Sequence, residues 1–295
     1  MPLWIAAFAM ALLRLAPINA EAATEIGTAD GSAEQMAAPY YREYYYTGGH
    51  YVNSSDGFVF RGQMYVERLI PAVPTDQLLP PIIIIHGGKQ RIDHLHHPHY
   101  LDHEVLSTYS AENIQRRFTA PERYRLWPQA ESHTQWPGAG VRGDPVFDAY
   151  YSSTVPNPYL EDLGVTESAF RVAIADLLQN HILEKSFVIG HSQGGLVAWQ
   201  SADAVPELVQ GLVVLEPSGP PFREQVFSWE DARAHGVGNA PLKYEPPGTE
   251  GSEEEAEEIG KPPRKLAQIS KVPVLLMTSE ASYHAVYDFC TVDFL

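Results

Sequence analysis

The sequence is poor in cysteine and in basic residues. Its 295 residues include one cysteine, Cys290, which excludes an intrachain disulfide framework and a cysteine-based metal cluster. Lys and Arg number 20 against 37 Asp and Glu, which gives a net charge of −17 with His neutral. Nucleic acids and anionic membranes require a basic surface. We therefore expect neither as a partner.

The sequence also lacks an apolar run long enough to cross a bilayer. The run at 3–13, LWIAAFAMALL, is about half of the ~20 residues that a spanning helix needs. Its length and position predict a secretory signal over 1–20 followed by a flexible arm over 21–39, so we expect a secreted protein. A buried N-terminal helix or an interfacial anchor is the alternative. The NSS tripeptide at 53–55 is a glycosylation sequon and agrees with export.

What the chain does contain is enough apolar sequence, 44%, for a large core. Two aromatic and β-branched stretches joined by turn residues predict antiparallel strands at 42–52 and 57–70. Short apolar runs predict buried strands at 82–85, 186–189, 209–216 and 272–280. Apolar residues at helical spacing predict a helix over 166–182. Strands that alternate with helices indicate an α/β fold with a mainly parallel sheet and antiparallel N-terminal strands.

Two long stretches show neither the pattern of a strand nor the spacing of a helix. Residues 107–160 are rich in Pro, Trp, Tyr and Gly, and we expect a long aromatic loop there. Residues 220–268 form an irregular, cap-like insert in a domain that we place at 40–295. The acidic block at 250–258 contains six Glu and is expected to be a solvated loop, because like charges repel.

The sequence GHSQG at 190–194 fits the G-x-S-x-G pattern. It follows an apolar strand and precedes an apolar helix, which is the context of a nucleophile elbow. In that turn the glycines avoid steric clashes, and the hydroxyl of Ser192 is exposed at a helix N-terminus. We therefore predict that Ser192 is a nucleophile. A glycine-rich turn without catalytic function is the alternative.

An oxyanion hole needs one N–H from the residue after the nucleophile, here Gln193, and a second from the loop after an earlier strand. The sequence His86-Gly87-Gly88 ends the apolar strand at 82–85, and we expect Gly88 to be the second donor. A plain turn at this place is the alternative.

Two carboxylates end predicted strands and could orient a catalytic histidine. Glu216 ends LVVLE, and Glu280 ends VLLMTSE. The residues alone leave both open, with a helix cap or a surface charge as the alternative for each. After Glu216 only His235 and His284 remain. His235 lies in the irregular insert, where no strand would position it, and no further strand fits after His284 to present a base. Without a base the serine hydroxyl is a poor nucleophile.

A histidine-rich segment follows the HGG sequence in the chain. It includes His94 and His96, with His97, His99 and His103 close by and Asp93 and Asp102 among them. Its spacing lacks the aspartate of a binuclear hydrolase motif, and we interpret it as a biased, solvent-exposed segment. We expect no metal and no cofactor.

The chain resembles the fungal branch of an atypical group of α/β-hydrolase esterases, related to a bacterial dimeric esterase. The resemblance rests on GHSQGG at 190–195, VVLEPSGPPF at 213–222 and QWPGAGVRGDP at 135–145. It extends to STYSAENIQRRFTAPERYRLWPQA at 107–130 and to VPVLLMTSEASYHAVYDFCTV at 272–292. It implies hydrolysis of a small-molecule carboxylic ester by Ser192 with Gln193 and the HG loop, Glu216 rather than Glu280 as the acid, and a homodimer.

The chain departs from this family in two places. The family follows its HG strand with a segment like TGxxWxxTPDGRxGWxxxF and a further central strand, whereas residues 89–106 contain neither. The family carries its catalytic histidine in a GxHGNxHM stretch beyond the last matched region, so His284 is not that histidine by position. We therefore expect an incomplete α/β-hydrolase sheet. Two functions follow as hypotheses: an esterase, or a catalytically dead or truncated member of the fold with a binding role or none.

Overall fold

The structure is a computed structural model. It describes residues 11–13, 39–55, 57–72, 74, 78–87, 105–107, 109–154, 157–159, 163–217, 244–245, 265–285 and 291–292. The predicted cut after residue 20, nearly all of the arm at 21–39, the histidines at 94–103 and nearly all of the 220–268 insert lie outside these residues. Among the helices described, none is both long and apolar enough for a membrane span.

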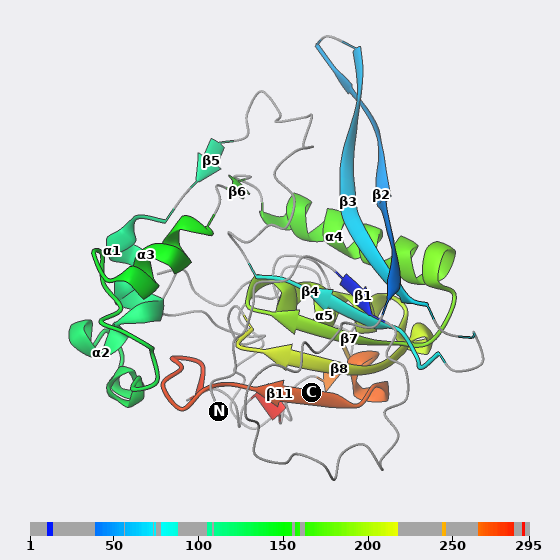
Figure 1. Cartoon of the computed structure of the whole chain (residues 1–295). Coiled ribbons are helices and arrows are strands. Elements are labelled where there is room, and N and C mark those ends of the chain that lie inside the picture. Colours follow the sequence, from blue (N-terminus) through cyan, green and yellow to red (C-terminus); the bar gives the residue numbers. More distant parts are fainter. Residues whose placement is uncertain are drawn as a thin grey trace.

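A seven-stranded sheet is the centre of the molecule, with the strand order β11-β8-β7-β4-β1-β3-β2 (Figure 1). Its strands are β1 (Ala11–Leu13), β2 (Tyr40–Ser54), β3 (Gly57–Pro71), β4 (Ile82–Ile85), β7 (Ser186–His191), β8 (Val209–Leu215) and β11 (Val274–Met277). Two small sheets pair β5 (Val105–Ser107) with β6 (Asn157–Tyr159), and β9 (Tyr244–Glu245) with β10 (Lys265–Leu266). All the predicted strands are present, and the predicted α/β class is confirmed.

The strands β4, β7, β8 and β11 are parallel neighbours. Their register pairs Ile85 with Gly190 and His191 with Leu215, so that their carboxyl ends lie at one edge. In an open parallel sheet this edge is where ligands bind, because the loops that leave the strands converge there. The sheet thus brings together the ends of four strands that are far apart in the sequence.

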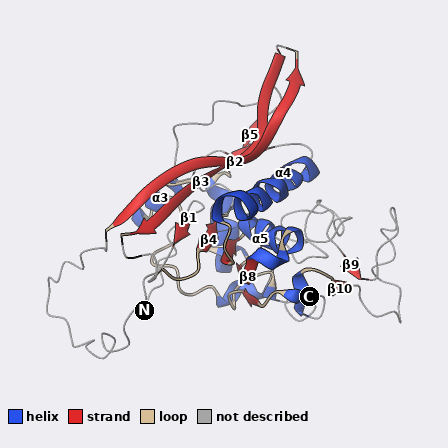
Figure 2. Ribbon diagram, turned by 90° about the vertical axis from the view of Figure 1, so that its right-hand side faces the viewer, coloured by secondary structure: helices blue, strands red, loops and turns tan. Residues whose placement is uncertain are grey.

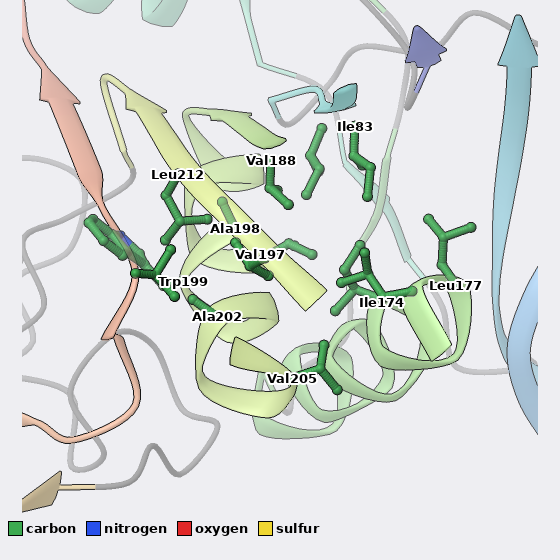
Figure 3. Close-up of a cluster of buried hydrophobic side chains, with 14 of the residues drawn as sticks. Ile83, Ile174, Leu177, Val188, Val197, Ala198, Trp199, Ala202, Val205 and Leu212 are labelled. Atoms are coloured by element: carbon green, nitrogen blue, oxygen red, sulfur yellow. The ribbon is translucent and has the colours of Figure 1, made fainter. Parts of the chain in front are cut away.

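Two helices cover this parallel region. Helix α4 (Leu163–Asp176) continues as a π-helical turn to Ile182, and α5 (Gln193–Ala204) follows β7 directly. Figure 3 shows side chains of both helices packed against Val188 and Leu212 of the sheet. Trp199 of α5 is among the largest fully buried side chains. The predicted helix over 166–182 is confirmed.

The prediction of a long loop at 107–160 is wrong. This stretch forms the short helices α1 (Ala111–Ile114), α2 (Pro121–Tyr124) and α3 (Pro145–Ser152), with a π-helical turn at Gln115–Thr119 and a 3-10 helix at Pro128–Ser132. Residues typical of helix starts begin these pieces. Asp144 accepts from the backbone N–H groups of Val146 and Phe147, and proline occupies the first turn of three of the helices.

The strands β2 and β3 form a long antiparallel ribbon that crosses α4 and then extends away from the body (Figures 1 and 2). At the crossing, Gly48 has a φ of 68°, and a Cβ there would lie 2.7 Å from the Cα of Ala173. The Thr47 hydroxyl donates to the Asp176 carboxylate at 2.5 Å, and the Gly48 N–H donates to the same oxygen at 2.8 Å. A glycine is therefore required for the ribbon to reach the helix.

A strand from the amino-terminal segment lies inside the central sheet. Strand β1 lies between β3 and β4, parallel to the first and antiparallel to the second. Ala11 pairs with Glu67 on one side and with Ile84 on the other. The sheet is continuous across this point. Residues 105–107, at the end of the stretch where the family's strand was expected, belong instead to a small separate sheet.

Candidate active site

Ser192 occupies the sharp turn between β7 and α5. Its φ of 53° and ψ of −121° are far from the regions that an L-residue ordinarily adopts. Its N–H donates to the Leu215 carbonyl at 3.0 Å, and its own carbonyl accepts from Gly195 N–H at 2.9 Å. Backbone strain of this kind persists where the surrounding structure holds it, and it is typical of functional sites. The geometry is that of a nucleophile elbow.

The glycines around Ser192 are required by close backbone approaches. A Cβ at Gly194 would lie 2.5 Å from the His86 carbonyl oxygen and closer still to that of Ile85. A Cβ at Gly190 would overlap the Gly194 carbonyl oxygen and lie 2.8 Å from the Cβ of Ala198. The pattern G-x-S-x-G therefore lets β4, β7 and α5 meet at the serine.

The loop after β4 lies directly beside the serine. A Cβ at Gly87 would come within 3.0 Å of the Ser192 Cβ and 3.2 Å of the His191 Nδ1. The predicted oxyanion donor Gly88 is the next residue and lies outside the described residues. The other predicted donor, Gln193, is the first residue of α5, and its exposed position at a helix N-terminus favours negative charge nearby. Gly87 itself was not singled out from the sequence, although the HGG motif contains it.

Glu216 follows β8, the neighbour of the strand that carries Ser192. It has a φ of 43°, and its N–H donates to the Met277 carbonyl at 2.8 Å. Its carboxylate accepts from the Ser279 N–H and, at 2.6 Å, from the Ser282 hydroxyl. The alternative acid Glu280 is exposed. The loop after β11 therefore holds the Glu216 carboxylate in place, which no motif in the sequence indicated.

His191 lies near this carboxylate, and His86 lies near His191. Burial lowers the pKa of His191, the nearby Glu216 carboxylate opposes that change, and His86 lowers the pKa further. The Nδ1 of His86 lies 2.6 Å from the Gly87 carbonyl oxygen. Ser192 is therefore flanked by the backbone of the HG loop, and the imidazole of His191 is close enough to Glu216 to sense its charge.

His284 lies in the loop that holds Glu216 and is 4% exposed. Its backbone N–H donates to the Ser282 hydroxyl oxygen at 3.0 Å, and its ring lies 3.8 Å from that of Tyr283 between centroids. Burial lowers the pKa of His284 to about 4. Within the described part of the chain, its Nδ1 has no hydrogen-bond partner. The backbone of His284 thus joins the Glu216 network, whereas its ring nitrogen Nδ1 does not.

The helical segment at 111–152 contacts the loop after β11, which also contains His284. The indole N–H of Trp127 donates to the Ala281 carbonyl at 2.8 Å, and the Trp127 and Tyr283 rings contact edge to face at 5.8 Å. Trp127 is largely buried. The aromatic segment at 107–160 therefore contacts the site through the loop after β11.

A metal centre finds no support in the described residues, which contain no group of three or more His, Cys, Asp or Glu placed to hold an ion. His94 and His96 of the histidine-rich segment, like His235, lie outside those residues.

A strained serine at the carboxyl edge of parallel strands, with a carboxylate at the end of the next strand, defines an α/β hydrolase. A family profile described as the alpha/beta hydrolase fold matches residues 141–241, which include Ser192 and Glu216. The chain is 31% identical to a probable secreted lipase, phiG, of Fungal sp. (strain ATCC 74256), over 85% of this chain and 77% of that protein. It is also 37% identical to epoxide hydrolase 1 of Caenorhabditis elegans, but over 62 residues only, 20% of this chain and 15% of that protein. The chain belongs to the α/β-hydrolase family.

Proposed function

We propose that this chain is a serine hydrolase of carboxylic esters, of the lipase or esterase type. The observation that carries the proposal is the backbone of Ser192, which is held at a φ of 53° where β7 turns into α5, beside Gly87. The similarity to a probable secreted lipase supports the same class of substrate.

In the proposed reaction the hydroxyl oxygen of Ser192 attacks the ester carbonyl carbon. The N–H groups of Gln193 and Gly88 stabilise the negative charge that develops on the carbonyl oxygen. The alcohol leaves, and water then hydrolyses the acyl-serine. Glu216 orients the imidazole that accepts the serine proton and returns it to the leaving alcohol.

Two candidate functions differ in whether the chain has a catalytic base. His284 is the candidate for an active enzyme, because its backbone N–H already joins the Ser282–Glu216 network. A catalytically silent chain with a binding role is the second candidate. It is favoured by the described geometry, in which the Ser279 N–H donates to one oxygen of the Glu216 carboxylate and the Ser282 hydroxyl donates to the other.

A fluorophosphonate probe, which labels activated serines, distinguishes the two. For the active enzyme we expect labelling of the folded chain, loss of labelling in Ser192→Ala, and unchanged labelling in the control Ser152→Ala, whose serine lies on the surface of α3. Hydrolysis of p-nitrophenyl esters should follow the same pattern, and His284→Asn should slow both reactions. A folded chain that neither labels nor hydrolyses any ester in a series of acyl lengths would leave the silent candidate.

We also propose that the chain is exported and that residues 1–20 serve as the leader. The apolar run at 3–13 and the name of the fungal relative, a probable secreted lipase, support export. Recovery of the protein from culture medium, and its N-terminal sequence there, test both statements. A homodimer is proposed on the family resemblance alone, and light scattering of the purified protein tests it.

A further inference from the structure

The sequon at 53–55 spans the end of β2 and the first residue of the turn to β3. Asn53 and Ser55 are both exposed there, and Asn53 faces Phe58 across the ribbon. The chain contains six asparagines, and Asn53 alone is followed two positions later by Ser or Thr. The sequence therefore offers one candidate acceptor for an N-linked glycan, and the structure places it on the surface.

The position of this turn is favourable for a large modifying enzyme. The ribbon packs on α4 near Gly48 and extends outward beyond that point, so that the turn is at the end farthest from the sheet in both views (Figures 1 and 2). A glycan at such a place displaces no packed side chain. Acceptor sites of this kind are surface loops in secreted proteins.

Aromatic side chains surround the acceptor on one face of the ribbon. Residues directly opposite in an antiparallel pair project to the same face, as do residues two apart in one strand. Asn53 therefore shares a face with its partner Phe58, with Tyr51 and with the partner of Tyr51, Phe60. Tyr51 is 71% exposed and Phe58 is 75% exposed, and Tyr51 contacts Phe60 edge to face at 5.1 Å.

This exposed aromatic surface has the chemistry that a sugar ring covers well. One face of a pyranose ring is lined by C–H groups, which pack on the electron-rich face of an aromatic ring, while its hydroxyl groups remain in water. An apolar group at a polar surface is a site for such a contact, because burial removes apolar area from water.

We propose that Asn53 is N-glycosylated during export and that the first sugars of the glycan pack on Tyr51 and Phe58. In the reaction the side-chain amide nitrogen of Asn53 forms a bond to the anomeric carbon of an oligosaccharide carried on a lipid diphosphate. The bond from that carbon to the diphosphate oxygen breaks, the lipid diphosphate leaves, and the amide nitrogen loses one proton. The inference rests on the proposed export of the chain.

The experiment uses two chains, so that failure of export and failure of glycosylation are distinguishable. One is the full chain, and the other is the same full chain behind a foreign signal sequence, both produced in a eukaryotic secretory host. We expect an intact mass above that of the polypeptide, which returns to the polypeptide mass on treatment with peptide N-glycosidase. Asn53→Gln and Ser55→Ala should abolish the added mass, Ser55→Thr should keep it, and the control Asn113→Gln should leave it unchanged.

An exported chain with an unmodified Asn53 behind the foreign signal would overturn the inference. Glycosylation behind the foreign signal, together with failure of the full chain to be exported, would overturn the proposed leader and leave the glycosylation site standing.

The aromatic contact is tested separately by thermal unfolding. The glycosylated protein should unfold at a higher temperature than Asn53→Gln, and this difference should disappear when both proteins also carry Phe58→Ser. An equal difference with and without Phe58→Ser would show that the glycan does not pack on this ring.

Discussion

Replacement of Gly194 by alanine tests the close approach on which the proposed site depends. The new Cβ would lie 2.5 Å from the His86 carbonyl oxygen and closer to that of Ile85, and both obstructing atoms belong to the backbone. Alanine in place of glycine in a helix gains up to ~1 kcal/mol of helix propensity. Overpacking against a well-packed backbone costs about 1–3 kcal/mol and more where the backbone must move. We expect a net loss of about 2 kcal/mol in the free energy of unfolding.

The same substitution should affect the site more than the stability. The carbonyl groups of Ile85 and His86 would have to move, and the next residue is Gly87. A Cβ at Gly87 would lie 3.0 Å from the Ser192 Cβ, so the movement would reach the serine. A displacement of about 1 Å in a reacting constellation can lower the rate about 100-fold. For an active enzyme we therefore expect Gly194→Ala to slow fluorophosphonate labelling by roughly that factor while the protein remains folded.

The assay pairs urea unfolding with labelling kinetics, and Gly195→Ala is the matched control. A Cβ at Gly195 meets Pro217 at 3.0 Å, a tight contact with no overlap of backbone oxygens, so its effect on both measurements should be smaller. If Gly194→Ala were as stable as the wild type and labelled at the same rate, the close packing of β4 on the elbow would be refuted.

Three further predictions concern pH and strain. Hydrogen bonds from Thr47 and other donors hold the pKa of Asp176 at about 2, below its ordinary 3.8, so its contribution to stability is present above pH 3.8 and is lost as the pH falls toward 2. Asp176→Asn should therefore flatten the acid side of a plot of urea midpoint against pH. Burial lowers the pKa of His284 from 6.5 to about 4, so the neutral ring favours folding above pH 6.5, and this contribution is lost as the pH falls through about 4. His284→Phe should remove that loss, and an unchanged pH dependence would contradict the burial of the ring. Ser192→Gly should have a free energy of unfolding in urea that is about 1 kcal/mol higher than that of Ser192→Ala, because glycine relieves the backbone strain at a φ of 53° that alanine keeps.

The strands and the elbow could be predicted because their signals are local. A run of four isoleucines and the sequence GHSQG each carry their own pattern, and the structure has β4 and the Ser192 turn at those residues. The short helices at 111–152 were missed because each is too short to show a periodicity. Their caps, Ser110 and Asp144, were nevertheless visible in the sequence.

The parts of the site that the sequence did not indicate depend on contacts between distant segments. Ser279 and Ser282 donate to Glu216 because β8 and β11 are parallel neighbours. Nothing in the sequence around either serine predicts that contact. The position of Gly87 beside Ser192 likewise follows from the pairing of β4 with β7. Such pairings are set by the order of strands in the sheet, which a single sequence does not specify.

The position of strand β1 makes the outcome of leader removal depend on whether cleavage comes before or after folding. It lies in the interior of the sheet and pairs with β3 on one side and β4 on the other, yet it belongs to the segment that we propose as the leader. An interior strand is released only when the hydrogen bonds on both of its edges break, so cleavage after folding would leave the cut piece trapped between its neighbours. Cleavage of the unfolded chain would meet no such barrier. The order of these two events therefore decides whether the mature protein folds around this strand or closes its sheet without it.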